Sequence, residues 1–291
     1  MKVLVTGGSG FLGSHIADEL TVRGHDVSIF DNCVSKYIHD NQHMIVGSIV
    51  DKNDVLNAIK DKDAVYHFAG IAGIDDCKKN PYNAINVNIN GTVNVLEACI
   101  NNSVPRVMFA SSAYVFSKYG YIYKTTKIAC ENIIRDYSSI YGIKYTNMRF
   151  GSLYGRRTDD RNSIYKILKN AIENKSIEYN GTGEEYREYI HALDAAKLAV
   201  DLLNDEYINK DIMITGQERF KYKDLLNMVN EMLGNNITIK YKNRDDDCHY
   251  TLTPYNFNAN VGVKIVGNKF IDLGQGLLEC MLEISTKNGS N

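Results

Sequence analysis

The chain has 291 residues, of which 33 are Lys or Arg and 35 are Asp or Glu, so its formal net charge is −2. A chain of this length can bury one large core or two modest ones. The near balance of charge gives no electrostatic basis for binding nucleic acid or an anionic membrane, which favours a small-molecule partner. No apolar run reaches the length of a signal peptide or a membrane span, so we expect a cytoplasmic protein.

Cysteine and histidine positions predict neither a disulfide framework nor a metal site. The six cysteines contain no C-x-x-C pair and no metal-ligand spacing, so we expect reduced thiols, mainly in the core. His39 and His43 are four residues apart, but Asp40-Asn41-Gln42 between them is typical of a polar loop. We therefore predict no bound metal.

The glycine-rich stretch at residues 6–13, Thr-Gly-Gly-Ser-Gly-Phe-Leu-Gly, is the first that indicates chemistry. It follows the apolar run 3–5, which predicts a buried strand, and it precedes apolar residues at helical spacing. In such a turn Gly7 permits the tight reversal, Gly10 lets the backbone approach a pyrophosphate, and Gly13 lets the helix pack on the strand. The helix N-terminus then presents unpaired N–H groups to the phosphate. An ordinary tight turn is the alternative for a glycine triplet taken alone.

A second apolar strand, predicted over residues 27–30, ends at Asp31. A carboxylate at this position can accept hydrogen bonds from the adenosine ribose hydroxyls of NAD, and it would repel a 2′-phosphate. Asn32 and Cys33 follow it, where an NADP site would favour Arg or Lys. The cofactor predicted from these residues is NAD rather than NADP.

Strands and helices alternate along the chain up to about residue 150. Gly70 lies just after one of these strands, and a small residue there would let a bound ring approach the backbone. The alternation predicts an α/β fold with a Rossmann-like, doubly wound parallel sheet that binds its ligand at the carboxyl ends of the strands. The further strands are predicted over 43–46, 63–69, 105–111 and 145–150, and the helices over 81–101 and 121–141.

Beyond residue 151 the alternation weakens. We interpret residues 1–152 as an NAD-binding domain that 189–216 rejoins, and residues 153–188 and 217–291 as a smaller, mixed substrate-binding domain. No internal repeat or low-complexity linker is visible. Helices are predicted over 164–173, 195–203, 225–233 and 277–284, and a strand over 211–215.

Redox chemistry at NAD requires a group that moves a proton when hydride moves, and a Tyr with a Lys four residues later can do this. The spacing puts both side chains on one helix face, where the ammonium lowers the pKa of the phenol. Chance alone gives roughly two such pairs in a chain of this composition, so position has to choose between them. The pairs present are Tyr114 with Lys118, Tyr123 with Lys127, and Tyr165 with Lys169.

Position favours Tyr123 and Lys127, because they open the helix between the fifth and sixth predicted strands. The other two pairs lie at a strand end and outside the nucleotide-binding unit. Ser111 and Ser112, at the carboxyl end of the fifth strand, would stand beside the nicotinamide, where a hydroxyl can hydrogen-bond the reacting oxygen. Capping of the strand end is the alternative explanation of these serines.

Together these residues resemble the extended short-chain dehydrogenase/reductases, specifically the NAD-dependent nucleotide-sugar epimerase/dehydratase group, over nearly the whole chain. The resemblance implies NAD as the cofactor and a nucleoside-diphosphate sugar as the substrate. We also expect a homodimer, formed through the helical faces around 83–101 and 123–141. The family motifs are matched by residues 6–13, 31–32, 67–70, 88–92, 111–113, 123–131, 149–155 and 181–194.

The resemblance also implies a role for each matched residue. The catalytic residues are Ser112, Tyr123 and Lys127. The cofactor contacts are Gly7, Gly10, Phe11, Leu12, Gly13, Asp31, Asn32, Ser48, Ile49, Phe68, Ala69, Gly70, Asn88, Ala110, Ser111, Tyr123, Lys127 and Phe150. The substrate contacts are Ser112, Ala113, Tyr123, Ser152, Arg187 and Arg244. The two arginines would bind the diphosphate, because a guanidinium fork matches two oxygens; for Arg244 a solvated surface charge is the alternative.

Three departures from the family pattern limit what the resemblance implies. Ser48 stands where the family usually has an Asp near the adenine, and Ser152 stands where many epimerases have an Asn that touches the substrate. Ser112 and Tyr123 are only eleven residues apart, so a loop that normally lies over the sugar is missing. Ten extended residues still reach ~33 Å, which lets both hydroxyls share one site.

The residues after Ser112 bear on the reaction. Dehydratases of this group carry an Asp-Glu pair there, because eliminating water requires an added acid and base. Ala113 and Tyr114 occupy these places, which disfavours dehydration. We predict an epimerase that acts at C4 of a nucleoside-diphosphate sugar through a transient 4-keto intermediate. The alternatives are an NAD(H)-dependent reductase of a nucleotide-linked keto sugar and a catalytically silent dinucleotide-sensing protein.

Overall fold

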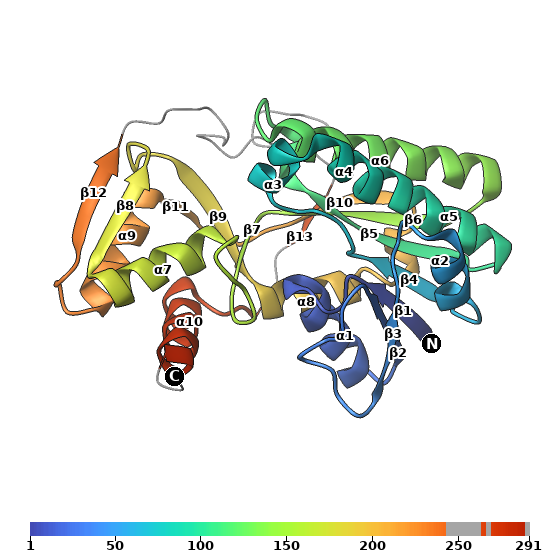
Figure 1. Ribbon diagram of the computed structural model, residues 1–291, viewed down its shortest axis with the longest axis horizontal. Helices are drawn as coiled ribbons and strands as arrows, with labels where there is room; N and C mark the ends of the chain where they lie inside the picture. Colours follow the sequence, from blue (N-terminus) through green and yellow to red (C-terminus); the bar gives the residue numbers. More distant parts are fainter. Residues whose placement is uncertain (243–262, 266–268, 289–291) are drawn as a thin grey trace.

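The computed structural model describes residues 1–242, 263–265 and 269–288 (Figure 1). Its largest element is an eight-stranded sheet in which every neighbouring pair is parallel, as predicted. The order of the strands reverses between β1 and β4, which is the switch point that opens a ligand crevice in such sheets. Across the sheet the strands are β13 (Val263–Ile265), β10 (Lys210–Ile214), β6 (Lys144–Phe150), β5 (Arg106–Ser112), β4 (Ala64–His67), β1 (Lys2–Thr6), β2 (Asp26–Asp31) and β3 (Gln42–Val46).

Different helices cover the two faces of this sheet. Successive residues of a strand point to opposite faces, so the apolar strands contribute side chains to a core cluster on each face. On β1, Val3 and Val5 join one core cluster and Leu4 joins the other. Among the helices that the structure describes, none is long and apolar enough to cross a membrane. The covering helices are α1 (Phe11–Val22) and α8 (Ala192–Asp201) on the first face, and α2 (Lys52–Ile59), α5 (Gly91–Asn101) and α6 (Tyr121–Tyr141) on the second.

Local sequence signals set several helix ends. The Asp51 carboxylate caps α2 by accepting hydrogen bonds from two backbone N–H groups in the first turn, and Asn162 does the same for α7 (Ser163–Asn174). Gly142 ends α6 in the left-handed conformation, with φ of 76°. Gly142 therefore explains why α6 ends at residue 141, as predicted.

The helix predicted over residues 81–101 consists of three segments instead of one. It runs as α4 (Pro81–Ile85), a π-helical turn (Asn86–Asn90) and α5. The π turn carries Asn88, whose carbonyl oxygen accepts hydrogen bonds from Thr92 and Cys130. Such turns often occur at functional sites, and this one lies beside α6, which also packs against α3 (Ile74–Lys79).

Most of the remaining chain forms a smaller lobe with its own core, which includes Tyr154, Leu168, Leu225 and Leu277 (Figure 1). Its strands were not predicted; in Tyr186–His191, buried polar residues hide the usual apolar pattern. β13 lies in the range assigned to the smaller domain, yet it pairs with β10 of the large sheet. The lobe contains the sheet β11 (Arg219–Lys221), β9 (Tyr186–His191) and β7 (Ser152–Tyr154), the pair β12 (Thr238–Lys242) and β8 (Ser176–Asn180), and the helices α7, α9 (Tyr222–Met232) and α10 (Leu273–Asn288).

His67, at the end of β4, makes the stability of the fold dependent on pH. Its ring lies between the hydroxyls of Thr6 (2.7 Å) and Thr92 (3.0 Å), and burial lowers its pKa to about 3. In the unfolded chain His67 binds a proton near pH 6.5, whereas in the folded protein the ring stays neutral. The contribution of the neutral ring to the free energy of unfolding is therefore present above pH 6.5 and is lost as the pH falls toward 3.

We expect the free energy of unfolding to fall more steeply below pH 6.5 in the wild type than in His67→Gln, by up to roughly 1.4 kcal/mol per pH unit. Denaturant unfolding between pH 7 and pH 4 measures both slopes. Equal slopes would show that His67 is protonated alike in the folded and unfolded states.

Candidate active site

The glycine turn after β1 leaves no room for side chains. Gly7 has φ of 72°, and a Cβ built on it would lie 2.5 Å from the backbone nitrogen of Ala69. A Cβ on Gly13 would lie 2.2 Å from the carbonyl oxygen of Gly7. The turn is therefore packed backbone against backbone, and this bare surface at the start of α1 fits the phosphates of a dinucleotide.

Asp31 is held beside this turn. Its Oδ2 accepts a hydrogen bond from the backbone N–H of Ser9 (3.0 Å), and its Oδ1 accepts one from the Cys33 thiol (3.7 Å). The Ser9 hydroxyl in turn donates to the carbonyl of Cys33 (2.8 Å). The carboxylate is thus oriented before any ligand binds, which fits the role expected for it at the ribose of NAD.

The remaining predicted cofactor contacts lie along one edge of the sheet, at the carboxyl ends of its strands. The rings of Phe68 and Phe150, which follow β4 and end β6, are 5.9 Å apart across the end of β5. The structure therefore brings together residues that are far apart in sequence. They are Phe11 and Leu12 at the start of α1, Asn32 after β2, Ser48 and Ile49 after β3, Phe68, Ala69 and Gly70 after β4, Ala110 and Ser111 in β5, and Phe150 in β6.

Asn88 holds the loop that follows β4. Its Oδ1 accepts a hydrogen bond from the N–H of Ile71 (2.7 Å), and its Nδ2 donates to the carbonyl of Ile71 (3.1 Å) and to the Thr126 hydroxyl (3.0 Å). Both amide hydrogens are therefore committed to protein groups. Asn88 positions the loop against α6 rather than presenting a free amide to the cofactor.

Ser112, Tyr123 and Lys127 come together at the carboxyl end of β5. The Ser112 side chain lies within interaction distance of the Tyr123 side chain, so the short link between them does not separate the two groups. Lys127 lies one helical turn after Tyr123; its Nζ donates to the carbonyl of Ala110 (2.7 Å) and lies 6.0 Å from the Tyr123 ring centroid. Of the three Tyr–Lys pairs, this is the one that lies on a single helix packed against β5.

Burial dominates the electrostatics of this group. It raises the pKa of Tyr123, with the Ser112 hydrogen bond acting against it and Cys77 adding to it. Burial therefore sets the direction of the phenol pKa shift in the protein alone, opposite to the lowering expected from the lysine and nicotinamide charges together. Burial also lowers the pKa of Lys127, and Cys130, Cys77 and Glu131 act against that shift.

Sequence reasoning gave Ser111 a contact with the cofactor and gave no role to its actual partners. The Ser111 hydroxyl donates to Glu131 Oε1 at 2.6 Å, so this hydroxyl points toward α6. The hydroxyl is therefore engaged by the protein rather than directed at a cofactor. Glu131 also pairs with Arg149 of β6. Arg149 is the one charged residue in the predicted strand 145–150, and this was the available signal for a buried ion pair.

The predicted substrate residues lie at the end of β5 and in the three-stranded sheet β11–β9–β7. Ser152 opens β7 opposite Tyr189 of β9, and Ala113 is buried directly after β5. Arg187 is 5% exposed; its Nη1 donates to the carbonyl of Tyr186 (2.7 Å), and its Cζ lies 5.5 Å from the ring of Tyr222. Arg244 lies outside the described residues.

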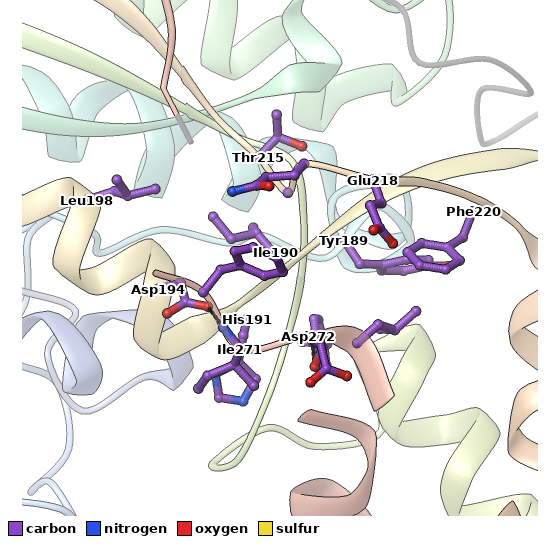
Figure 2. A pocket seen from close by; sticks show the side chains of 15 residues that line it. Tyr189, Ile190, His191, Asp194, Leu198, Thr215, Glu218, Phe220, Ile271 and Asp272 are labelled. Carbon is purple, nitrogen blue, oxygen red and sulfur yellow. Dashed lines mark hydrogen bonds between the residues drawn. The ribbon is translucent and has the colours of Figure 1, made fainter. Parts of the chain in front are cut away.

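A pocket of about 170 Å³ opens next to this region, between β9, α8, the segment after β10 and the segment before α10 (Figure 2). Asp194 Oδ2 accepts a hydrogen bond from the N–H of Ile271 (2.7 Å) at its edge. Ser112, Tyr123 and Lys127 are not part of the described lining. The lining is Tyr154, Tyr189, Ile190, His191, Asp194, Leu198, Thr215, Gly216, Gln217, Glu218, Phe220, Phe270, Ile271, Asp272 and Leu273.

Comparison with known proteins identifies the family. Residues 3–214 match the NAD dependent epimerase/dehydratase family. The chain belongs to this family. Its cofactor is accordingly NAD, and the predicted family, Rossmann-like fold and cofactor are confirmed.

Relatives in the epimerase/dehydratase family catalyse several reactions. The UDP-N-acetyl-alpha-D-glucosaminuronate decarboxylase of Bacillus cytotoxicus is 30% identical over 244 residues, 75% of each chain. A putative UDP-glucose 4-epimerase of Methanocaldococcus jannaschii is 29% identical over 255 residues, 80% of this chain and 82% of the relative. The UDP-glucose 4-epimerase of Thermotoga maritima, solved with UDP-glucose, superposes with a TM-score of 0.84 at 21% identity over 99% and 100% of the chains. The protein is thus an enzyme of this family, and the family contains more than one chemistry.

Proposed function

We propose that the protein is an NAD-dependent epimerase that inverts C4 of a nucleoside-diphosphate sugar through a transient 4-keto sugar. The observation that carries the proposal is that the side chains of Ser112 and Tyr123 meet at the end of β5, with Lys127 one helical turn after Tyr123. This group lies at the carboxyl edge of a sheet whose glycine turn fits a dinucleotide. A base, a hydroxyl donor and a cation beside a hydride acceptor are what oxidation of a sugar carbinol requires.

In this proposal Tyr123 takes the proton of the sugar 4-hydroxyl and later returns it. Bound NAD supplies the chemistry of accepting and returning the C4 hydride. The Ser112 hydroxyl donates a hydrogen bond to the reacting oxygen. The raised pKa of Tyr123 opposes loss of its proton, and the Lys127 ammonium acts in the other direction.

Inversion requires the keto sugar to present its other face before the hydride returns. A substrate held by its diphosphate can turn about that link while remaining bound. We propose that Arg187 and the smaller lobe, residues 153–188 and 217–291, hold the nucleotide part, since a guanidinium matches two phosphate oxygens. Arg187 would exchange its bond to the Tyr186 carbonyl for the phosphate.

Two other chemistries of the family have less support. The residues after Ser112, Ala113 and Tyr114, carry a methyl and a phenol, and the N–H of Tyr114 is hydrogen-bonded to Ser112 Oγ (3.3 Å). This segment therefore supplies no carboxylate for eliminating water. A reductase of a keto sugar would use the same residues as the epimerase and differs in consuming NADH.

We further propose a homodimer formed through the helical faces around 83–101 and 123–141. Ile85, Ile140 and Tyr141 are 43%, 69% and 55% exposed. A subunit contact along these helices would cover such exposed apolar side chains.

The test of the proposed function is incubation of the protein with UDP-, GDP-, CDP- and dTDP-sugars, including both C4 epimers and a glucuronic acid. Product stereochemistry, NADH absorbance and CO₂ release are recorded. We expect interconversion of one pair of C4 epimers without net change in NADH. Net consumption of NADH would indicate a reductase, CO₂ release a decarboxylase, and absence of turnover on every sugar a dinucleotide-sensing protein.

A further inference from the structure

Glu131 is a buried carboxylate in contact with the segments that carry the proposed catalytic residues. It lies on α6, one turn after Lys127, and is 3% exposed. Its Oε1 accepts hydrogen bonds from the hydroxyl of Ser111 (2.6 Å) and from Nε of Arg149 (2.9 Å). Its Oε2 accepts one from Nη2 of Arg149 (2.7 Å). One side chain thus joins α6 to the carboxyl ends of β5 and β6.

The charge of Glu131 is compensated within a closed network. Arg149 also donates to Asp211 (2.8 Å), and Arg135 donates to both Glu131 (2.9 Å) and Asp211 (2.6 Å). Two carboxylates therefore face two guanidinium groups. A buried ion pair is tolerated when the charges balance and each is hydrogen-bonded, and it fixes geometry more than it adds stability.

The same network holds the short link between Ser112 and Tyr123. The ring of Phe116, in the middle of this link, lies 4.7 Å from the Arg149 guanidinium carbon. A guanidinium over an aromatic face is an attractive contact, and it is stronger when it is desolvated. Because Arg149 is held by Glu131 through two hydrogen bonds, the position of the link depends on the carboxylate.

Glu131 also acts on Lys127 through its charge. It raises the pKa of this buried lysine against the larger effect of burial, together with Cys130 on the same helix and Cys77 on α3. The other groups that face Lys127 are Tyr123 on α6, His67 on β4, and the ring of Phe109 and the carbonyl of Ala110 on β5. Among the described groups around Lys127, Glu131 is the carboxylate.

We propose that Glu131 is a positioning residue of the active site, which fixes the strand end that carries Ser112, the short link, and the helix that carries Tyr123 and Lys127. The kinetic part of this inference rests on the proposed function. A purely structural role would lower stability alone. A positioning role would also change turnover and the ionisation of Lys127.

The test compares Glu131→Gln with Asp211→Asn as a matched control. Each variant removes one carboxylate charge from the same pair of arginines. Glu131 also accepts a hydrogen bond from Ser111, whereas Asp211 does not contact Ser111. With the substrate found in the sugar panel, we expect kcat of Glu131→Gln to fall roughly 10- to 100-fold with little change in KM. We expect kcat of Asp211→Asn to stay within roughly twofold, although its Tm falls.

A second readout needs no substrate. Nitrogen-15 NMR of the lysine side chains, with Lys127→Arg to assign the signal, follows the titration of Lys127 directly. Removing the nearby negative charge disfavours the ammonium, so the Lys127 midpoint should move to lower pH in Glu131→Gln and stay in place in Asp211→Asn. The alkaline limb of the kcat profile should move with it.

Equal losses of Tm in both variants, with unchanged kcat and an unchanged Lys127 midpoint, would overturn the inference. If the wild type converts no sugar nucleotide, the proposed function fails and the NMR titration alone decides the role of Glu131. If Glu131→Gln does not fold, Ser111→Ala removes only the bond to β5, and it should lower kcat roughly three- to tenfold. A wild-type rate in Ser111→Ala would then overturn it.

Discussion

Replacing Tyr123 with Phe should abolish nearly all turnover and leave NAD bound. The substitution removes the hydroxyl that lies beside Ser112 and keeps the ring that packs with Cys77 and Ala84. Loss of a general acid–base group slows a reaction by a factor of roughly 10² to 10⁴, so kcat should fall by that amount. Steady-state assays on the interconverted sugar pair and calorimetric titration with NAD measure the two quantities separately.

Tyr165→Phe provides the matched control for this substitution. Tyr165 also precedes a lysine by four residues, Lys169, but it lies on α7 in the smaller lobe. We expect its kcat and NAD affinity to remain close to those of the wild type. A near wild-type rate in Tyr123→Phe would eliminate Tyr123 as the acid–base group.

Gly13→Ala should nearly abolish NAD binding. A Cβ at Gly13 would lie 2.2 Å from the carbonyl oxygen of Gly7 and 3.0 Å from Cα of Gly8, and both are backbone atoms that cannot move aside. The start of α1 would have to shift from the turn, which costs about 1–3 kcal/mol of stability and withdraws the N–H groups that face the phosphates. We expect NAD affinity to fall at least roughly 100-fold, a loss of about 2.7 kcal/mol in binding free energy.

Gly24→Asn is the control for the glycine substitution. Gly24 has φ of 81°, and a Cβ built on it meets no atom within 4 Å. Asn tolerates this left-handed backbone, so NAD affinity should be unchanged. Calorimetry measures NAD binding, and thermal unfolding measures the change in stability. Wild-type NAD affinity in Gly13→Ala would show that the dinucleotide binds elsewhere.

The sequence by itself determined the parts of the protein that depend on local patterns. Apolar runs and helical spacing located the six strands from β1 to β6 and the helix α6, because each of these segments buries an apolar face along its own length. The glycine turn and Asp31 were recognisable, since a backbone that must reverse and approach a phosphate admits few residue types. The spacing of Tyr123 and Lys127 was readable because four residues make one helical turn.

Tertiary structure decided what depends on partners distant in the chain. The strand β9 of the smaller lobe buries Arg187 and Glu188, so its sequence carries no apolar period that could reveal it. Whether the short link would let Ser112 meet Tyr123 depended on the path of residues 113–120, and eleven residues permit many separations.

The direction of the Tyr123 pKa shift and the partners of Ser111 were likewise decided by the assembled fold. Burial raises the pKa of the phenol, and burial is a property of all surrounding elements together. Ser111 donates its hydroxyl to Glu131, twenty residues away, because β5 and α6 pack against each other. Residue types and their spacing indicate which groups are present, whereas desolvation and hydrogen-bond pairing act over distances of a few ångströms that exist only after the chain has folded.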